Sequence, residues 1–586
     1  MKTNLRKTLS IALLSVGSLA SLTGCGGSSS SYDPDNFLPN GTSENPYQIV
    51  KEPVTIKIFA PHSSGSPEYK DMKMFKYLSK VTNLNFEFTT PDTSAYSARR
   101  AAVWEDRNYK PDLFLFNNQI SEQVQYAENH FDALTPFNDS TYTDSTGNVG
   151  NLIDNYMPTY KKLLDENFAI STSVENAKET AMVSDGKMYC SLSVKDVARD
   201  LTYKMFINNV WIKNIYSSYP NSYAKTHEID DASKISTIED YVGILTDFNS
   251  YDANNNGKTN DEIAVSSKAF EYLRNFIIQS YGYVSYGCEL ESDGTKFTYV
   301  PKTEAYKRYL QTANSLWEAG LMDKSSPENK TDSQMATNGK RLGSFVAAAP
   351  YIITTQQEDK NNLKEDGTAY KYDEEYVTVG PLLSSYYNGP RIQLGFGYFI
   401  PDGATIPSAS VYKREVARLL DIMYSDLGTQ LISYGVEGED WTWDDDAHSS
   451  WTFHVPDTWT GNQEDYRATI TPNAGSASAL YWSNAFVGKM SGEEISRLNR
   501  QSEIYTPYLK IPEPAKYKFT SSEYERISTI KASLDSQITY YEASFITGTL
   551  DIDNENDWNT YLSTIERFNA TELVTIYNTM LARYQK

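Results

Sequence analysis

The pattern of hydrophobic and polar residues after residue 50 predicts alternating strands and helices. Apolar and polar side chains alternate over residues 54–59 and again over 84–88, and residues 111–116 form a mostly apolar run, which is typical of β-strands. Between the first two strands, apolar side chains recur at helical spacing, which predicts a helix over residues 68–82 with a face made of Met72, Phe75, Leu78 and Val81. Strand, helix and strand in this order predict an α/β fold with a parallel sheet and right-handed crossovers.

The carboxyl ends of these strands are where we expect a ligand to bind. Ligands of parallel sheets lie outside the carboxyl ends of the strands. In this chain the loops at those ends are residues 62–67, which begin with His62, and residues 117–119.

Helical periodicity returns further along the chain. Residues 238–248 carry an apolar face, and Ser236 and Glu239 have the spacing of a capping box at its start. A late helix is predicted over residues 411–431. The region after residue 447 should be mainly helical, judging by residues 493–504, 522–534 and 557–581.

The first 24 residues have the composition of an export signal. Lys2, Arg6 and Lys7 precede an apolar stretch that is too short to span a bilayer as a stable helix. The stretch ends in Leu22-Thr23-Gly24-Cys25, which resembles the lipobox of bacterial lipoproteins, where the cysteine is acylated and becomes the new N-terminus. We therefore expect a signal peptide over residues 1–24 and a palmitate-type lipid anchor on Cys25.

A polar segment separates this anchor from the rest of the chain. Residues 26–45 are rich in glycine, serine, proline and other polar residues, so residues 25–50 should behave as a flexible tether that carries the lipid. The remaining stretch, about 540 residues, exceeds the size at which one hydrophobic core keeps growing, so we expect at least two lobes. No later window approaches the roughly 18 to 20 apolar residues of a membrane helix, so we expect a body outside the bilayer.

The charge narrows the choice of partner. The formal net charge is −23, and removing Lys2, Arg6 and Lys7 with the signal peptide takes it to −26. A chain this acidic is a poor partner for nucleic acid. The acidic residues are spread along the sequence, so most of them should form an ordinary solvated surface.

Two cysteines remain after lipidation. Cys190 and Cys288 could form a disulfide in an exported protein, but nothing in their spacing requires one. We favour two separate buried thiols, because a free cysteine packs as a small hydrophobic residue.

Oxygen-bearing side chains are concentrated over residues 252–262, directly after the predicted helix 238–248. A glycine lies in the middle of the segment, and this combination suits a hard cation such as Ca²⁺. The usual twelve-residue calcium loop would need its bidentate glutamate at Ile263, so we expect a tighter loop around a structural Ca²⁺. Its ligands would be Asp252, Asn254, Asn256, the Lys258 carbonyl, Asp261 and Glu262. The alternative is a turn rich in Asn and Gly that binds no metal.

Several short motifs, taken in order, resemble the family 1 extracellular solute-binding proteins of ABC importers. They follow the lipobox and cover most of residues 50–445, and the chain is most similar to the large lipoproteins found beside carbohydrate permeases in Gram-positive bacteria. The matching segments are residues 109–113 (YKPDL), 185–189 (DGKMY), the loop that ends at 261–262 (DE), 316–321 (LWEAGL) and 434–443 (YGVEGEDWTW). The family commonly carries an Ile-Arg-x-Asp-Trp-Leu segment where this chain has residues 206–212 (FINNVWI), so that arginine is absent.

The resemblance implies an α/β fold of the type II periplasmic-binding-protein kind, with two lobes, each a sheet flanked by helices, joined by multiple hinge crossings. By analogy, the first lobe would span 51–188, the second 189–394 with the loop 252–262, and a return to the first lobe with a hinge 395–456. Residues 457–586 would be the mostly helical C-terminal part of the second lobe. Crossings are expected near 185–194, 393–401 and 454–472, where Gly395 and Gly397 suit a hinge.

The function implied by the resemblance is capture without catalysis. Such a protein binds a carbohydrate, commonly an oligosaccharide, between its lobes and delivers it to the transmembrane subunits of an ABC permease. It would work as a monomer, tethered by lipid to the extracellular face of a Gram-positive cell membrane, with no organic cofactor. A peptide or another small solute stays open as the ligand.

Carbohydrate chemistry suggests candidate ligand residues, because aromatic faces pack under sugar rings while polar side chains bind hydroxyls. The chain has 45 Tyr and 9 Trp. The first candidates are Trp441, Trp443 and Trp451, in a segment that also contains Glu437, Asp440, Asp444, Asp445 and Asp446. Further candidates, each near a predicted strand end or crossing, are His62, Tyr203, Tyr351, Arg391 and Tyr398. The alternative is that some of these tryptophans pack beneath the segment while its acids form a solvated turn.

Two rival classes use the same residues. A glycoside hydrolase could place paired carboxylates in the tryptophan-rich segment, about 5 to 10 Å apart. Against it, the chain has no G-x-S-x-G elbow, no H-E-x-x-H helix and no P-loop, and its 5 histidines are dispersed. A surface lipoprotein that captures polysaccharide without a permease would use the same aromatic residues but would need no large hinge motion.

Overall fold

The protein is described from a computed structural model. The described residues are 32–62, 66–106, 109–116, 134–141, 143, 150–165, 177–183, 185–195, 204–259, 261–284, 286–329, 342–347, 375–389, 392, 399–400, 402–460, 463–472, 480–491, 501, 503–509 and 517–585. Their buried hydrophobic side chains form two large clusters, which we call the cores of the first and the second lobe.

The sheet of the first lobe confirms the predicted parallel pairing. β1 (Val54–Phe59) pairs in parallel with β2 (Leu84–Thr89) and with β3 (Leu113–Leu115), and β12 (Ala404–Thr405) adds an antiparallel edge in the order β12-β3-β1-β2. The link between β1 and β2 contains α1 (Lys73–Thr82), which buries Met74, Phe75 and Leu78. The apolar periodicity therefore located the strands and the end of the helix, but the helix begins at Lys73 and not at residue 68, because Met72 adopts an extended backbone.

Further helices complete the core of the first lobe. They include α15 (Lys413–Tyr424), whose Asp421 is fully buried and accepts hydrogen bonds from Thr159 N at 2.7 Å and Tyr160 N at 3.0 Å. This carboxylate caps the start of α5 (Pro158–Asp165) and so ties two distant parts of the sequence together. The remaining helical elements of the first lobe are η1 (Pro34–Asn36), η2 (Tyr69–Asp71), η3 (Thr93–Ala95), α2 (Tyr96–Glu105), α4 (Leu152–Tyr156), α5 (Pro158–Asp165), α6 (Ala177–Ala181), α16 (Asp426–Tyr434), α17 (Gln463–Arg467) and α18 (Asn484–Val487).

A small mixed sheet lies next to three chain crossings. β4 (Ser193–Lys195) pairs antiparallel with β11 (Phe399–Ile400) and in parallel with β15 (Tyr481–Trp482). β4 ends just before the chain enters the second lobe, and β11 begins just after it returns. β15 is followed by residues up to Met490 that still pack in the first core.

The sheet of the second lobe has the order β10-β5-β9-β6. β5 (Lys204–Asn208) pairs antiparallel with β10 (Tyr376–Val379) and with β9 (Leu342–Ala347), and β9 pairs in parallel with β6 (Ile263–Ser266). A separate hairpin joins β7 (Cys288–Leu290) to β8 (Phe297–Tyr299). The helical elements before residue 330 are α7 (Asn209–Ser218), α8 (Tyr223–Thr226), η6 (Ala232–Lys234), α9 (Ile238–Ser250), α10 (Glu271–Ile277), η7 (Ile278–Tyr281), η8 (Val300–Lys302), α11 (Glu304–Glu318) and η9 (Ser326–Glu328).

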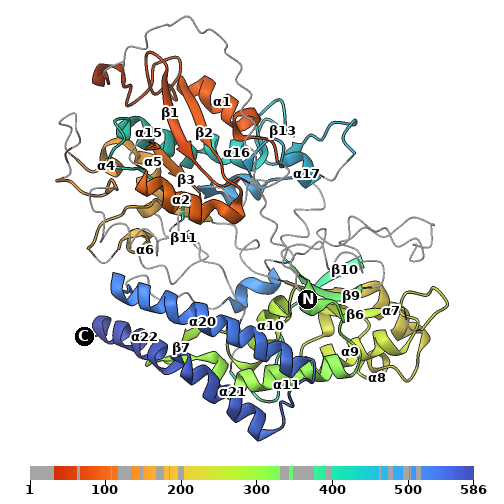
Figure 1. The fold of residues 1–586 in the computed structure, drawn as a ribbon. Helices are drawn as coiled ribbons and strands as arrows, with labels where there is room; N and C mark the ends of the chain where they lie inside the picture. The colour runs from red at the N-terminus through yellow and green to blue at the C-terminus, as the bar shows by residue number, and fades with distance from the viewer. Residues whose placement is uncertain are drawn as a thin grey trace, which may run out of the picture. The chain divides into compact units, whose positions relative to one another are not determined.

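The C-terminal helices belong to the second lobe. They are α20 (Ser521–Ile546), α21 (Glu555–Arg567) and α22 (Ala570–Tyr584), with η12 (Thr506–Tyr508) before them, and Figure 1 shows α20 and α21 beside α11. A buried ion pair joins α20 to α10, because Arg274 Nη1 lies 2.7 Å from Glu542 Oε2. Tyr309 on α11 donates its hydroxyl to the other oxygen of Glu542 at 2.7 Å. Glu542 thus connects three helices of this core.

Three further predicted helix boundaries need correction. The capping box of α9 is formed by Thr237 and Asp240, one residue later than predicted, because the Asp240 carboxylate accepts from the backbone N–H groups of Ser236 and Thr237. The predicted helix 411–431 breaks at Ser425, whose hydroxyl caps α16. The predicted helix 557–581 breaks after α21, where Asn569 adopts a left-handed backbone with φ of 69°.

The cores also bear on the proposed lobe boundaries. We expected residues 457–586 in the second lobe and a crossing near 454–472. Ile470, Trp482 and Met490 instead pack in the first core, whereas the Tyr505 hydroxyl bonds Met205 N in the second lobe at 3.1 Å. We therefore place the third crossing between residues 491 and 505, because β15 must first pair with β4.

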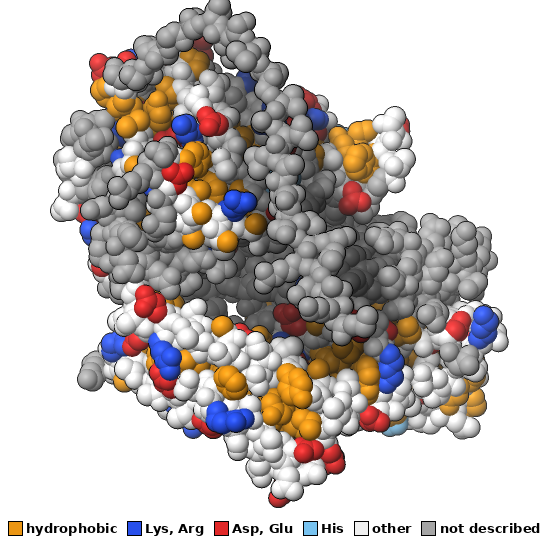
Figure 2. Space-filling model, viewed as in Figure 1, with side chains coloured by type: hydrophobic (Ala, Val, Ile, Leu, Met, Phe, Trp, Pro, Cys, Tyr) orange, Lys and Arg blue, Asp and Glu red, His pale blue; other side chains and the backbone are white. Residues whose placement is uncertain are grey.

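The surface of the described residues is mixed in charge. On the face shown in Figure 2, acidic and basic side chains are interspersed and do not form one large patch of a single sign. This agrees with a solvated surface for most of the acids. None of the helices in the described ranges is long and apolar enough to cross a membrane.

Candidate functional site

The carboxyl edge of the first-lobe sheet places His62 where the sequence predicted it. His62 follows β1 and forms a parallel bridge with Asp92, which follows β2. Its ring is half-buried, with Nε2 3.0 Å from the Pro67 carbonyl oxygen and the ring centroid 5.8 Å from that of Tyr69. The imidazole is thus oriented by the loop that it begins, at the edge where parallel sheets bind ligands.

A cluster of aromatic rings and one arginine lies at the same edge and was missed by the sequence analysis. Tyr96 on α2 stacks on Phe59, the last residue of β1, with centroids 5.4 Å apart. Arg100, one turn later and only 1% exposed, places its guanidinium carbon 5.0 Å from the centre of the Tyr96 ring. Trp104 stacks on Phe114 of β3 at 4.6 Å. The side chains from α2 thus cover the carboxyl ends of two strands.

The arginine also lies close to the first chain crossing. Cys190 is buried, and its electrostatic neighbours include Asp402 and Arg100. Burial, followed by the Asp402 charge, raises the pKa of the Cys190 thiol to about 12. Because Arg100 is buried, a ligand could reach its guanidinium only by replacing its present contacts.

The three candidate tryptophans occupy a hairpin of β13 (Trp441–Trp443) and β14 (Trp451–Phe453). Trp441 and Trp451 are both 0% exposed. Their indole N–H groups already donate to backbone carbonyls, Trp441 to Gly435 at 3.2 Å and Trp451 to Phe486 at 2.8 Å. The structure therefore corrects the prediction for these two residues, because neither ring has a face or a polar edge left for a sugar.

Trp443 differs from its two neighbours. It is half-buried, its ring is parallel to that of His448 within 2°, and the centroids are 4.3 Å apart. Lys489 Nζ lies 5.7 Å from the Trp443 centroid. Trp443 is the candidate of this trio with accessible surface, and a ligand there would have to share the ring with these neighbours.

Several acidic residues around the hairpin are already partnered within the protein, whereas Glu437 and Asp446 have no side-chain partner among the described residues. Asp440 is fully buried and accepts from Lys73 Nζ at 2.5 Å and from Val436 N at 2.9 Å. Asp444 accepts from the hydroxyls of Ser450 and Thr452, both at 2.7 Å, and these bonds lower its pKa. The carboxylates of this segment therefore hold the hairpin together, and Asp440 is bound as an ion pair, which does not suit general acid or base catalysis.

Four further candidates cannot be placed. Tyr203, Tyr351, Arg391 and Tyr398 lie outside the described residues, as do the hinge glycines Gly395 and Gly397.

The second lobe has a polar edge of its own. β6 ends at Ser266, whose hydroxyl donates to Asp323 Oδ2 at 2.9 Å. The next residue, Ser267, accepts a hydrogen bond at its carbonyl from Asn329 Nδ2 at 3.2 Å. Lys204, 1% exposed, begins β5 opposite the end of β9. Sequence analysis missed these residues, because serine and asparagine in loops have no distinguishing spacing.

The loop 252–262 is folded around its own oxygen atoms. Asp252 accepts from Asn256 N at 3.0 Å and from Gly257 N at 2.8 Å, while Asn256 Nδ2 donates to Asp261 Oδ2 at 2.8 Å. Glu262 Oε1 accepts from Ala253 N at 3.0 Å. The predicted ligand residues Asp252, Asn254, Asn256, Asp261 and Glu262 thus take part in a single hydrogen-bonded loop, which also includes Lys258 N, a donor to Asn256 Oδ1 at 2.9 Å.

Two oxygen atoms in this loop lack partners. Asp261 Oδ1 and Glu262 Oε2 are buried and accept no hydrogen bond from the described residues. Burial of Glu262, which is 7% exposed, raises the pKa of its carboxyl group. Among the residues that the structure describes, no three His, Cys, Asp or Glu side chains gather as a metal-binding group. The loop instead combines two carboxylates that need a partner with amide and carbonyl oxygens, a donor set that fits Ca²⁺.

The two cysteines are both thiols. The expectation that they form no disulfide is confirmed, but Cys288 is half-exposed and not buried, because it lies on β7 beside a surface pocket.

Comparisons with known proteins can now be set beside this geometry. No protein-family model matches the chain. Over 595 residues it is 24% identical to the fructooligosaccharide ABC transporter substrate-binding protein FusA of Streptococcus pneumoniae, and the alignment covers 98% of each protein. The solved structure of a FusA EF-hand mutant in complex with fructo-nystose matches with a TM-score of 0.68 and 18% identity over 91% of this chain and 99% of that one.

A second structural neighbour comes from another genus. It is an HMO-binding, ABC-transporter-associated solute-binding protein from Bifidobacterium longum infantis. It matches with a TM-score of 0.67 and 15% identity over 92% of this chain and all of the neighbour. The chain has the fold of an ABC-transporter solute-binding protein. This match and the two open sheets with their flanking helices agree with the predicted α/β fold of two lobes.

Proposed function

We propose that this protein is an extracellular solute-binding lipoprotein that captures an oligosaccharide and delivers it to an ABC permease. The observation that carries the proposal is similarity along the whole chain. Both the sequence match to a fructooligosaccharide-binding protein and the structural matches to oligosaccharide-binding proteins span more than nine-tenths of it. From those proteins we infer only the class of the ligand, an oligosaccharide. Experiment must identify the particular sugar.

The residues that we propose for the ligand come from the carboxyl edge of the first-lobe sheet and from the hairpin β13–β14. In the first lobe, His62, Arg100 and the rim of Trp443 offer a half-buried imidazole, a guanidinium and an accessible aromatic ring. Sugars are bound by such combinations of flat aromatic faces and hydrogen-bonding groups. Tyr203, Tyr351, Arg391 and Tyr398 stay candidates by their position in the sequence. We no longer propose Trp441 and Trp451 as ligand residues, because both are fully buried.

Capture and delivery would couple through a change in the equilibrium between open and closed forms. A sugar that binds the closed form more tightly shifts the population toward it by that difference in affinity. A permease that recognises the closed form would then select loaded protein. The small sheet β11-β4-β15 beside the crossings is where we place the hinge.

The loop 252–262 would hold a structural Ca²⁺. The support is the pair of buried oxygens on Asp261 and Glu262, together with the existence of an EF-hand mutant of FusA. Asp252, Asn254, Asn256 and the Lys258 carbonyl would supply the other oxygen atoms. The ion would supply positive charge to these carboxylates and fix the loop at the end of α9.

The anchor would be the acylated Cys25 followed by the tether. This would keep the protein at the extracellular face of the membrane, beside its permease. Replacing Cys25 by alanine should release the protein into the medium, whereas a protein that is held by its permease alone would stay with the cells.

Binding to the purified protein tests the proposed function. Fructooligosaccharides, milk-type oligosaccharides and monosaccharides would be compared by calorimetry and thermal unfolding. A sugar at 100 times its dissociation constant should add about 2.7 kcal/mol to the unfolding free energy. Chromatography of the sugar after incubation would detect cleavage, and cleavage would overturn a purely binding function.

Variants test the placement of the ligand. His62→Ala and Trp443→Ala should lower the affinity for the sugar that binds most tightly. Trp459→Ala is the matched control, because Trp459 is an exposed tryptophan of the same lobe that we do not assign to the ligand site. Equal effects of Trp443→Ala and Trp459→Ala would remove Trp443 from the site.

A further inference from the structure

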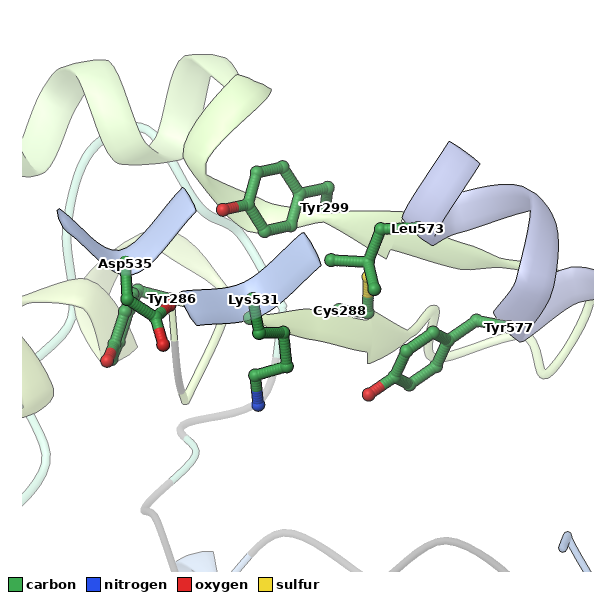
Figure 3. Close-up of a pocket in the computed structure, with 8 residues that line it drawn as sticks. Tyr286, Cys288, Tyr299, Lys531, Asp535, Leu573 and Tyr577 are labelled. Carbon is green, nitrogen blue, oxygen red and sulfur yellow. The ribbon is translucent and has the colours of Figure 1, made fainter. Parts of the chain in front are cut away.

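A pocket in the second lobe is built from elements that the proposed sugar site does not use. It lies among the hairpin β7–β8 and the helices α20 and α22, has a volume of about 180 Å³, and is shown in Figure 3. It is lined by Tyr286, Gly287, Cys288, Tyr299, Lys531, Asp535, Leu573 and Tyr577. Neither sheet edge contributes to it.

The wall of this pocket contains a tyrosine hydroxyl that has no partner among the described residues. Tyr299 is 4% exposed, and its hydroxyl makes no hydrogen bond with any described residue. Figure 3 shows this hydroxyl directed along the pocket toward the end where Asp535 and Tyr286 lie. A tyrosine hydroxyl that faces a pocket and has no partner in the protein offers a ligand both a donor and an acceptor.

The carboxylate at that end is also unpartnered. Asp535 is half-buried, and its side chain makes no hydrogen bond or ion pair with the described residues. Lys531 lies one helical turn away, yet its ammonium group forms no ion pair with Asp535. Burial raises the pKa of Asp535, with the charges of Lys531 and Arg274 opposing that effect. A cation between Asp535 and Tyr299 would satisfy both side chains.

The aromatic lining suits a cation as well. Tyrosine faces attract positive charge, and the chain already uses one of these rings in this way, because the Arg274 guanidinium lies 3.9 Å from the centre of the Tyr286 ring. Tyr299, Tyr577 and Leu573 offer apolar surface beside it. Since a cavity of about 150 Å³ can hold benzene, this pocket has room for a ligand with one small ring or a short alkyl chain.

We propose that this pocket binds a small organic ammonium ion. Its N–H groups would donate to the Asp535 carboxylate and to the Tyr299 hydroxyl oxygen, and its apolar body would lie against Tyr577, Leu573 and Cys288. The site is separate from the proposed sugar site and does not depend on it. An occupied pocket would join the hairpin β7–β8 to the two C-terminal helices and so stabilise their packing.

The first experiment uses benzylamine as the probe and the purified protein without sugar. Benzyl alcohol and benzoate are its neutral and anionic counterparts of nearly the same size. Half-exposed Cys288 in the pocket wall reports occupancy through its rate of alkylation by iodoacetamide, and buried Cys190 is the internal reference. Calorimetry gives the dissociation constants independently. Benzylamine should slow alkylation of Cys288 but not of Cys190, and should bind at least about tenfold more tightly than either counterpart, since a hydrogen bond between charged groups is stronger than a neutral one.

Matched variants locate the binding groups. Asp535→Asn keeps the shape and removes the charge, so benzylamine should bind about tenfold more weakly or worse. Tyr299→Phe removes one acceptor and should weaken binding by about threefold to tenfold. Glu525→Gln removes an exposed carboxylate from the same helix and should leave the affinity unchanged. The unfolding midpoint of each variant without ligand checks that it folds.

Four results would overturn the proposal. The first three are equal affinity for benzylamine and benzyl alcohol, unchanged benzylamine affinity in Asp535→Asn, and the absence of saturable benzylamine binding in calorimetry. Tighter binding of benzoate would also overturn it, because the ligand would then pair with Lys531. None of these results bears on sugar binding, which is measured separately.

Discussion

Two acidic segments of this protein look alike in sequence and differ in structure. The hairpin region 436–453 and the loop 252–262 each combine aspartate, glutamate and hydrogen-bonding side chains. In the hairpin, Asp440 and Asp444 have partners supplied by the chain itself. In the loop, Asp261 Oδ1 and Glu262 Oε2 are buried without one. The number of acidic residues in a segment therefore says little about ligand binding. Whether each carboxylate oxygen has a hydrogen-bond partner within the protein distinguishes a structural segment from a candidate binding site.

The largest expected effect concerns the core of the hairpin. Trp441→Ala should lower the unfolding free energy by about 3–5 kcal/mol, because it opens a cavity under a fully buried ring. Denaturant unfolding measures this directly. Trp443→Ala, two residues away and half-buried, is the control and should cost clearly less. Equal losses for the two variants would mean that Trp441 does not carry the packing that its burial indicates.

The next effect tests whether the hairpin acids are structural. Asp440→Asn places an amide where Lys73 and Val436 N both donate, so one of these donors loses its acceptor. We expect a loss of about 1.5–3 kcal/mol in denaturant unfolding. Glu439→Gln is the matched control, since Glu439 is exposed and lies 3.8 Å from the same lysine, a geometry worth at most about 1 kcal/mol. If Asp440→Asn left the unfolding free energy unchanged, the buried pair would contribute nothing to stability.

The third prediction addresses the loop. Added Ca²⁺ at 100 times its dissociation constant should raise the unfolding free energy by about 2.7 kcal/mol, and chelation should reverse this. Glu262→Gln should remove most of the response, because it takes one charged oxygen from the proposed donor set. Asp444→Asn should leave the response intact. If Asp444→Asn abolished the response while Glu262→Gln kept it, the ion would be bound at the hairpin, and the loop 252–262 would be the segment without a ligand.

Sequence patterns predicted the strands and helices better than they predicted which side chains are buried. The first strands and the end of the first helix were located correctly because their apolar periodicity is set by one sheet and one packing face. The predicted helix 411–431 failed at Ser425, where a side-chain cap that no hydrophobic pattern reveals starts a new helix. Trp441 and Trp451 were mistaken for ligand residues because an indole ring suits a core as well as a sugar, and only the tertiary structure shows their N–H groups already bonded.

Other residues of the candidate site were missed because the sequence does not show that they are buried. Arg100 lies on α2, a helix without strong amphipathic pattern whose other arginine is exposed, so nothing in the sequence marks it as buried. Its proximity to Cys190 and Asp402 arises from three distant segments that meet at a strand edge. In contrast, the candidate calcium loop could be named from the sequence because all its oxygen atoms come from eleven consecutive residues, 252–262. A candidate site made from one segment can be proposed from the sequence, whereas one assembled from several segments needs the fold.

The smallest expected effect is a pH dependence in the hairpin. The hydroxyls of Ser450 and then Thr452 hold the pKa of Asp444 below its usual value, and the Ser449 hydroxyl and backbone N–H do the same for Asp445. The unfolded chain takes up these protons first, near about pH 3.9, so the contribution of both carboxylates to stability is present above that pH and is lost as the pH falls through their lowered native pKa values. NMR titration of the aspartate carboxyl carbons in the wild type and in Ser450→Ala measures this. Ser450→Ala should raise the pKa of Asp444 and leave that of Asp445 nearly unchanged, since the two acids use different donors. A common shift of both would mean that the acids titrate as one cluster, and the hairpin would then resemble the loop more closely than its hydrogen bonds indicate.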